Sequence, residues 1–316
     1  ISPGWEMPLQ YSGVVDEYRH VREAAGLFDV SHMGRIRVAG RGALEFLQRM
    51  TTNNVAAVPV LGAQYSMVCN PTGGVKDDIF IYHTGSDEYL VCVNASNRMK
   101  IVAWFREHQG STLVDIHDES DEVSQLALQG PASSIVLDKA GLTDVVGIKP
   151  RTGRTIAIHG ERCFVSRTGY TGERGWELYV PANLAPTLWD ELLKAGLCAG
   201  AAPVGLGARD LLRLEMGYLL YGSDVDEATT PLEAGAEWVV SFQKGDFVGR
   251  QLLLEQKQVG VGRRLVGFEL LERAVPRRGC QIRSPQSTEI GEVTSGNFSP
   301  ILQKGIGLGY VVSQYA

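Results

Sequence analysis

The sequence predicts an α+β protein whose last part contains β-strands only. Three observations support this prediction. Residues 35–131 alternate between strand-like and helix-like hydrophobic patterns, and residues 132–215 show a similar alternation. From residue 264 onward, short apolar runs are separated by glycines and prolines, which is typical of a small all-β domain. We therefore expect two α+β segments followed by a β-barrel or sandwich.

In the first segment, polar and apolar residues alternate over 35–40, which predicts a strand. Leu44, Leu47 and Met50 then repeat at helical spacing until a turn at 52–54, so a helix is expected from about Gly42 to Met50. Further strands are expected at 64–69, 78–82, 88–93 and 123–128, and a helix with apolar residues at i, i+3, i+4 and i+7 is expected at 98–108.

The second segment starts with an expected helix at 132–139. Strands are expected at 155–158, 163–166 and 176–180, and helices at 185–195 and 206–215. Residues 235–255 show a mixed pattern. The short strands of the tail are expected at 265–271, 279–283, 289–294 and 306–312.

Composition excludes several classes of function. The 316 residues include 30 Lys and Arg and 36 Asp and Glu, which gives a net charge of −6 and argues against a nucleic-acid partner. No window approaches 18 consecutive apolar residues, so no membrane span is expected. Glycine is abundant, with 37 residues, which indicates many turns.

Motifs that hold metals or nucleotides are missing. The five cysteines form no Cys-x-x-Cys pair and the six histidines are scattered, so we expect no metal and buried, reduced thiols. The sequence contains no P-loop, no Gly-x-Gly-x-x-Gly after a strand and no Gly-x-Ser-x-Gly elbow. Kinases, P-loop enzymes, Rossmann enzymes and serine hydrolases are therefore excluded.

Polar residues between glycines mark candidate sites. The loop at 169–175 leads into a strand in which Glu177 lies on the face opposite Trp176 and Leu178. Glu177 is either a solvated glutamate or a carboxylate that accepts paired N–H donors from a planar heterocycle. Arg209 lies on a predicted helix, where pairing with a nearby carboxylate is the simpler interpretation. The turn at 70–78 is by itself an ordinary hairpin with an acidic pair.

Several motifs occur along this chain in the same order as in a known protein family. The motifs are Gly4–Tyr11, Asp29–Gly34, the Gly73-Gly74 turn with Asp77-Asp78, Gln129–Pro131, Gly169–Glu177, Ala208–Asp210 with Leu212–Gly217 and Tyr221-Gly222, and Thr294–Gly296. With these motifs in this order, the chain resembles the aminomethyltransferase family, the T-protein of the glycine cleavage system. The resemblance covers essentially all residues, and the family extends beyond this chain at both ends.

The resemblance implies a three-domain cloverleaf around a central folate cavity, with ferredoxin-like or Greek-key α+β domains and a C-terminal jelly-roll-like β domain. Mapped onto this sequence, a discontinuous folate-binding domain comprises 1–40 and 132–243. An inserted α+β domain comprises 41–131. The C-terminal β domain comprises 244–316 and is expected to be truncated.

The resemblance also implies a reaction. Family members transfer the one-carbon unit from the aminomethyl-lipoyl arm of H-protein to tetrahydrofolate and release ammonia. Tetrahydrofolate is thus the expected substrate and one-carbon acceptor, without a metal, and lipoylated H-protein is the expected partner, without nucleic acid or membrane. The expected location is the cytoplasm, or the mitochondrial matrix in a eukaryote.

Carried over residue by residue, the family's folate-binding glutamate falls on Glu177 and its arginine on Arg209. Tyr170 matches a tyrosine that lies against the folate. Arginine can stack on a ring or hold a carboxylate, and tyrosine supplies a flat face with a polar tip. Asn94, just before a helix start, is a further candidate for a folate contact, with helix capping as the alternative.

One departure from the family pattern leaves the catalytic residue unassigned. Where the family has an aspartate, in the pattern N-A-x-x-x-x-K-D, this chain has Ile101. That carboxylate is thought to position or deprotonate the attacking folate nitrogen, which isoleucine cannot do. Three hypotheses remain: an aminomethyltransferase of full or reduced activity, a different tetrahydrofolate-dependent methyltransferase or demethylase, and a folate-binding paralogue without turnover.

Overall fold

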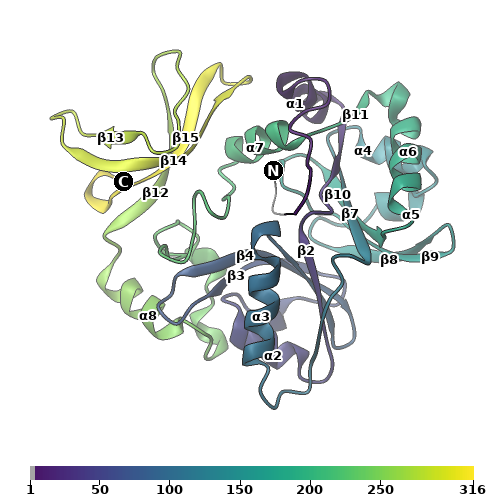
Figure 1. The fold of residues 1–316 in the computed structure, drawn as a ribbon, viewed down its shortest axis with the longest axis horizontal. Helices are drawn as coiled ribbons and strands as arrows, with labels where there is room; N and C mark the ends of the chain where they lie inside the picture. Colours follow the sequence, from purple (N-terminus) through teal and green to yellow (C-terminus); the bar gives the residue numbers. More distant parts are fainter. Residues whose placement is uncertain (1–3) are drawn as a thin grey trace. The chain divides into compact units, whose positions relative to one another are not determined.

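The computed structural model describes residues 4–316, which fall into two compact units (Figure 1). Unit 1 contains the described residues up to 46 together with 55–64 and 80–212. Unit 2 contains 47–54, 65–79 and 213–316. Two of the passages from one unit to the other lie inside strands, β3 (Ala63–Cys69) and β4 (Val75–Gly85). Each unit is therefore assembled from segments that lie far apart in the sequence.

A six-stranded sheet of unit 1 has the order β11-β1-β7-β10-β9-β8. All its neighbouring strands are antiparallel except β1 and β11, which are parallel. Its strands are β1 (Ala25–Asp29), β7 (Val123–Gln129), β8 (Gly153–Ile158), β9 (Glu161–Ser166), β10 (Gly175–Pro181) and β11 (Ala201–Pro203). The helices beside it are α1 (Val14–Glu23), α4 (Ser133–Lys139), α5 (Thr143–Val146), α6 (Ala185–Gly196) and α7 (Leu206–Glu215).

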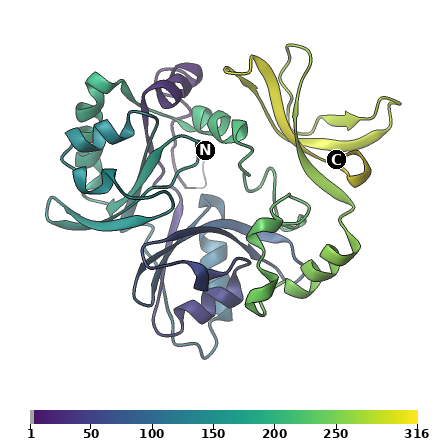
Figure 2. The same cartoon turned by 180° about the vertical axis from the view of Figure 1, so that it is seen from behind.

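The two faces of this sheet differ in polarity. Directly paired residues share a face and successive residues alternate. Trp176 therefore lies on one face, and Glu177, paired with Ala127, lies on the other. The face of Trp176 packs against α4, α5 and α6 in an apolar core. On the other face, Ala127 packs with Ala208 of α7 in a core that also includes α1. Figures 1 and 2 show the two sets of helices on opposite sides of the sheet.

The second sheet has the order β3-β4-β5-β2-β6. Besides β3 and β4, it contains the strands β2 (Gly34–Ala39), β5 (Glu88–Val93) and β6 (Asp115–Asp118). Along the chain, α2 (Ala43–Met50) lies between β2 and β3, and α3 (Arg98–His108) lies between β5 and β6. Within unit 1, the rings of Phe46 on α2 and Phe105 on α3 meet edge to face with centroids 5.4 Å apart, and both side chains are fully buried. This contact packs α2 against α3.

In unit 2, the tail forms a four-stranded antiparallel sheet of order β12-β15-β14-β13. Its strands are β12 (Arg263–Glu269), β13 (Gln281–Arg283), β14 (Glu289–Ser299) and β15 (Lys304–Val312), and α8 (Arg250–Val259) precedes them. Short 3₁₀ turns occupy Val55–Ala57, Ala95–Asn97, Leu197–Ala199, Glu237–Val239, Phe242–Lys244 and Ser313–Tyr315.

The expected α+β class with a C-terminal β part is confirmed. The helices at 98–108 and 206–215 and the strand at 88–93 have the predicted bounds, and the other expected elements are present with ends shifted by a few residues. The sequence patterns missed α1, β1, β6, α5, β11 and α8. Four of these six elements have only three to five residues, too few for a hydrophobic period to be visible. The three-domain division stays a prediction.

Candidate functional site

The carboxylate of Glu177 is buried in unit 1, and its side chain is only 9% exposed. Its Oε1 accepts a hydrogen bond from Gln125 Nε2 at 2.9 Å, and its Oε2 accepts one from the Tyr82 hydroxyl at 3.1 Å. The hydroxyl of Thr168 also donates to Oε2. The alternation that put Glu177 opposite Trp176 is thus matched by the structure, and a solvated glutamate is excluded.

The donors around this carboxylate form a connected network. Gln125 Nε2 also lies 3.1 Å from the Tyr179 hydroxyl, which donates to the Tyr82 hydroxyl at 3.0 Å. Burial raises the pKa of both Tyr82 and Tyr179 well above its usual value, so both remain protonated donors at neutral pH. An ionised carboxylate accepts about four hydrogen bonds, and the described residues supply three. Oε1 accepts one of these three bonds and Oε2 accepts two.

Arg209 and Tyr170 meet on the same side of unit 1. The guanidinium carbon of Arg209 lies 4.7 Å from the centroid of the Tyr170 ring, and both side chains are half-buried. A guanidinium that packs over a ring keeps its N–H donors in its own plane, where they can pair with a carboxylate. Because α7 covers the sheet face on which Glu177 lies, Arg209 and Glu177 share that face.

The loop that carries Tyr170 is held by buried polar contacts. The Gln129 amide donates to the Thr168 carbonyl at 3.1 Å and accepts from the Thr171 hydroxyl at 2.8 Å. A Cβ at Gly169 or Gly175 would lie 2.0 or 2.2 Å from that amide group, so only glycine fits at these two positions. The glycines of this motif therefore serve the packing of the loop.

A histidine within the Asp29–Gly34 motif, not named as a site residue from the sequence, borders the same face. His32 lies in the turn between β1 and β2, is 8% exposed, and its Nδ1 has no hydrogen-bond partner among the residues described. Burial and the nearby Arg209 lower the pKa of His32 to about 4, with Arg35 adding to the shift and Asp29 opposing it. The side chain is therefore neutral at physiological pH. A lone histidine has no periodicity or spacing that could have marked it.

The lowered pKa of His32 predicts a loss of stability in acid. Between pH 6.5 and 4 the unfolded chain binds a proton at this residue that the folded chain does not, so the free energy of unfolding falls as the pH drops through that window, by about 3 kcal/mol in total. We expect a His32→Gln variant to lose less stability than the wild type between pH 7 and pH 4 in urea unfolding. Parallel curves for the two proteins would contradict this assignment.

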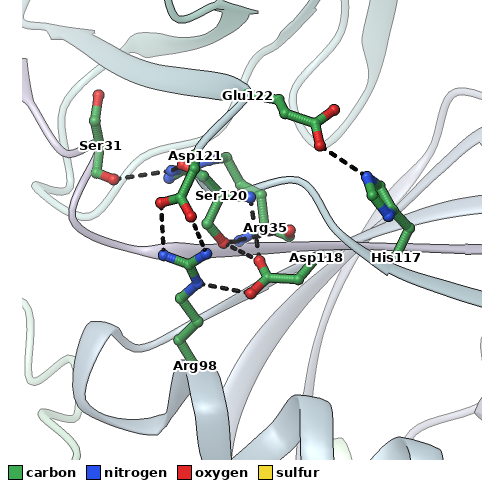
Figure 3. A network of polar contacts seen from close by, with 8 residues as sticks. All are labelled: Ser31, Arg35, Arg98, His117, Asp118, Ser120, Asp121 and Glu122. Carbon is green, nitrogen blue, oxygen red and sulfur yellow. Dashed lines mark hydrogen bonds and ion pairs between the residues drawn. The ribbon is translucent and has the colours of Figure 1, made fainter.

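Arg98, at the start of α3, belongs to an ion-pair network in unit 1 (Figure 3). Arg98 Nε lies 2.7 Å from Asp118, and its two terminal nitrogens bind both oxygens of Asp121 at 2.8–2.9 Å. The side chain of Ser120 links Asp118 to the backbone of Arg35. This network fixes the first turn of α3, in which Ile101 is fully buried.

Asn94 lies four residues before the start of α3. It caps the 3₁₀ turn at 95–97 through its carbonyl, which accepts a hydrogen bond from the Asn97 N–H at 2.9 Å, while its side chain makes no capping bond. The capping alternative thus concerns the Asn94 backbone, and the Asn94 side chain is half-buried.

Among residues 4–316, no group of three or more His, Cys, Asp or Glu side chains is arranged to hold a metal ion. Within the same residues, no helix has the length and apolar character needed to cross a membrane. All five cysteines are free thiols, and Cys69, Cys92 and Cys163 are buried as expected, whereas Cys198 and Cys280 are exposed.

Comparison with known proteins gives a consistent set of similarities. Residues 2–244 match the family described as the GCVT N-terminal domain, and residues 263–316 match the glycine cleavage T-protein C-terminal barrel domain. An aminomethyltransferase of Halothermothrix orenii is 47% identical over 98% of this chain and 86% of that protein. One from Thermoanaerobacter pseudethanolicus is 45% identical over 99% of this chain and 85% of that protein.

A solved structure is also similar. The crystal structure of glycine cleavage system aminomethyltransferase T from Bartonella henselae superimposes with a TM-score of 0.93 at 34% identity. The superposition covers 99% of this chain and 85% of that one. The architecture of this chain is therefore shared along nearly its whole length.

Proposed function

Since the chain belongs to the aminomethyltransferase family, the T-protein family of the glycine cleavage system, we propose that the polar face of the six-stranded sheet binds tetrahydrofolate for one-carbon transfer. The enzyme is an aminomethyltransferase, a transferase of glycine catabolism and one-carbon metabolism. One observation carries the proposal: Glu177, a buried carboxylate with an unused acceptor position, lies on the face that α7 covers with Arg209.

Each candidate residue has a chemical role in this proposal. A pterin offers adjacent N–H donors, and Glu177 Oε1 accepts one of them directly. A second pterin donor reaches the carboxylate only where Tyr82 or Thr168 gives up its bond to Oε2, because that oxygen already accepts two. Tyr170 supplies a flat face for the folate, Arg209 holds its carboxylate or stacks on a ring, and Asn94 contacts the one-carbon end.

The partner and the location are part of the same proposal. The one-carbon donor is the aminomethyl-lipoyl arm of H-protein, which leaves as dihydrolipoyl H-protein after ammonia release. The five free thiols favour a reducing compartment, the cytoplasm or the mitochondrial matrix in a eukaryote. The alternatives, a paralogue without turnover and a different methyl-group enzyme, are not favoured by the aminomethyltransferase names of the relatives.

The binding site is tested by removing the buried carboxylate. Glu177→Ala takes away the acceptor and leaves three buried donors without their partner, so we expect tetrahydrofolate to bind about 1–3 kcal/mol more weakly, roughly 5- to 150-fold in Kd. Isothermal titration calorimetry with tetrahydrofolate measures the change. Arg209→Met, at a half-exposed position that tolerates the change, should weaken binding as well.

The matched control is Glu161→Ala. Glu161 lies on β9, the neighbouring strand, but its side chain is exposed, so the affinity should stay at the wild-type value. An unchanged affinity in both Glu177→Ala and Arg209→Met would remove this face from the folate site, whatever the overall activity of the enzyme.

A further inference from the structure

The turn that carries His32 is rigidly fixed. The Ser31 N–H donates to Asp29 Oδ1 at 2.9 Å, and the Val30 N–H donates to the Gln125 carbonyl at 3.0 Å. A buried Arg35 guanidinium donates to the Ser31 carbonyl at 2.8 Å (Figure 3). The backbone of the turn is therefore anchored next to His32.

Within this turn, the imidazole of His32 lacks one hydrogen-bond partner. Its side chain is more than nine-tenths buried, yet Nδ1 has no partner in the described chain. Buried polar atoms in folded proteins are nearly always paired, because an unpaired one loses the hydrogen bonds that water gave it. Unlike most buried polar atoms, Nδ1 of His32 thus retains the capacity for a hydrogen bond with a ligand.

The turn lies between the two halves of the proposed folate site. Val30 packs in the same cluster as Ala208, the residue before Arg209. Met33 packs against this cluster and also against the one formed by Tyr82 and Tyr179, which surround the Glu177 carboxylate. His32 therefore lies near Arg209, on a turn whose residues Val30 and Met33 together pack against both clusters.

We propose that His32 forms a hydrogen bond with bound tetrahydrofolate and that Nδ1 is the atom that gains the partner. This inference rests on the proposed function of the same face. The charged groups facing His32 are Arg209 on α7, Arg35 on β2 and Asp29 at the end of β1. Burial keeps the ring neutral, and the two arginines add to its effect. The ring therefore offers one acceptor nitrogen and one N–H donor that orient the folate, and it is too weak a base to accept a proton at neutral pH.

The test replaces the imidazole with a ring of similar size that has no nitrogen. We expect His32→Phe to bind tetrahydrofolate about 10-fold more weakly by calorimetry, while its melting temperature without folate equals or exceeds the wild-type value, because an unpaired buried nitrogen has been removed. A purely structural histidine would give the reverse pattern, a lower melting temperature and unchanged affinity, and that result would overturn the proposal.

Two controls separate this inference from the proposed function. His117→Phe removes an imidazole that pairs with Glu122 and is 44% exposed, and its affinity should match the wild type. In ¹⁵N spectra of the wild type, the Nδ1 signal of His32 should shift on addition of tetrahydrofolate and that of His117 should not. A wild-type protein that binds no tetrahydrofolate would refute the proposed function itself, whereas wild-type affinity in His32→Phe would refute only the role of His32.

Discussion

Replacing Ile101 with aspartate is expected to raise the rate of one-carbon transfer by about 10²–10⁴-fold, the usual contribution of a positioned acid–base group. Ile101 lies in the first turn of α3, where the helix dipole favours a negative charge. The position is fully buried, so the new carboxylate also replaces apolar packing, and we expect the free energy of unfolding to fall by about 2–4 kcal/mol. The assay supplies aminomethylated H-protein and tetrahydrofolate and follows ammonia and methylene-tetrahydrofolate.

The matched control is Ile101→Asn, which has nearly the same shape as aspartate but cannot take up a proton. It should show the same loss of stability without the gain in rate. Equal rates in the wild type, Ile101→Asp and Ile101→Asn would mean that residue 101 takes no part in the reaction and that positioning of folate alone carries the transfer.

Loss of Asp224 should be the most destabilising single change in unit 2. Its carboxylate lies 2.6 Å from Arg213 NH1, and the two side chains are 0% and 1% exposed. It also accepts hydrogen bonds from the Leu220 N–H and from the hydroxyls of Thr294 and Ser295. Asp224→Ala leaves the arginine charge buried without a counter-ion, which costs about 3–5 kcal/mol in the free energy of unfolding. Urea unfolding measures this loss.

A double variant separates the pair from its surroundings. Arg213→Met combined with Asp224→Leu removes both charges and should recover much of the stability lost in Asp224→Ala, since apolar residues can replace a buried ion pair. An exposed pair gives the reference: Glu269→Gln breaks the contact of Glu269 with Lys304, 51% and 42% exposed, and should change stability by less than about 0.5 kcal/mol. A similarly small effect of Asp224→Ala on the free energy of unfolding would show that the buried ion pair contributes little to stability.

Elements with a long or uniform pattern could be predicted from the sequence, and short ones could not. The apolar residues of α3 recur over eleven positions, and β5 is an apolar run bounded by polar residues, so both were predicted with their observed ends. β11 has three residues and is recognised only by its parallel pairing with β1. That pairing joins residues about 175 positions apart, and no local property of the sequence encodes it.

The candidate site could likewise be predicted only in part from the sequence. Alternation in β10 was enough to put Glu177 on the face opposite Trp176, because side-chain direction is a local property of a strand. Its partners were not predictable: Tyr82 comes from a different sheet, 95 residues earlier in the chain. The unpaired Nδ1 of His32 could not be predicted from the sequence either, because only the packing of neighbouring elements determines whether a polar atom has a hydrogen-bond partner.

The interleaving of the two units has a genetic consequence. Met67, Cys69 and Val75 belong to the core that Leu253 and Phe247 complete, although they are encoded far upstream of those two residues. No single recombination point in the gene can therefore transfer either unit intact to another protein, since every crossover near the middle of the chain separates core residues that must pack together. The exchange of either unit between genes therefore requires several crossovers together.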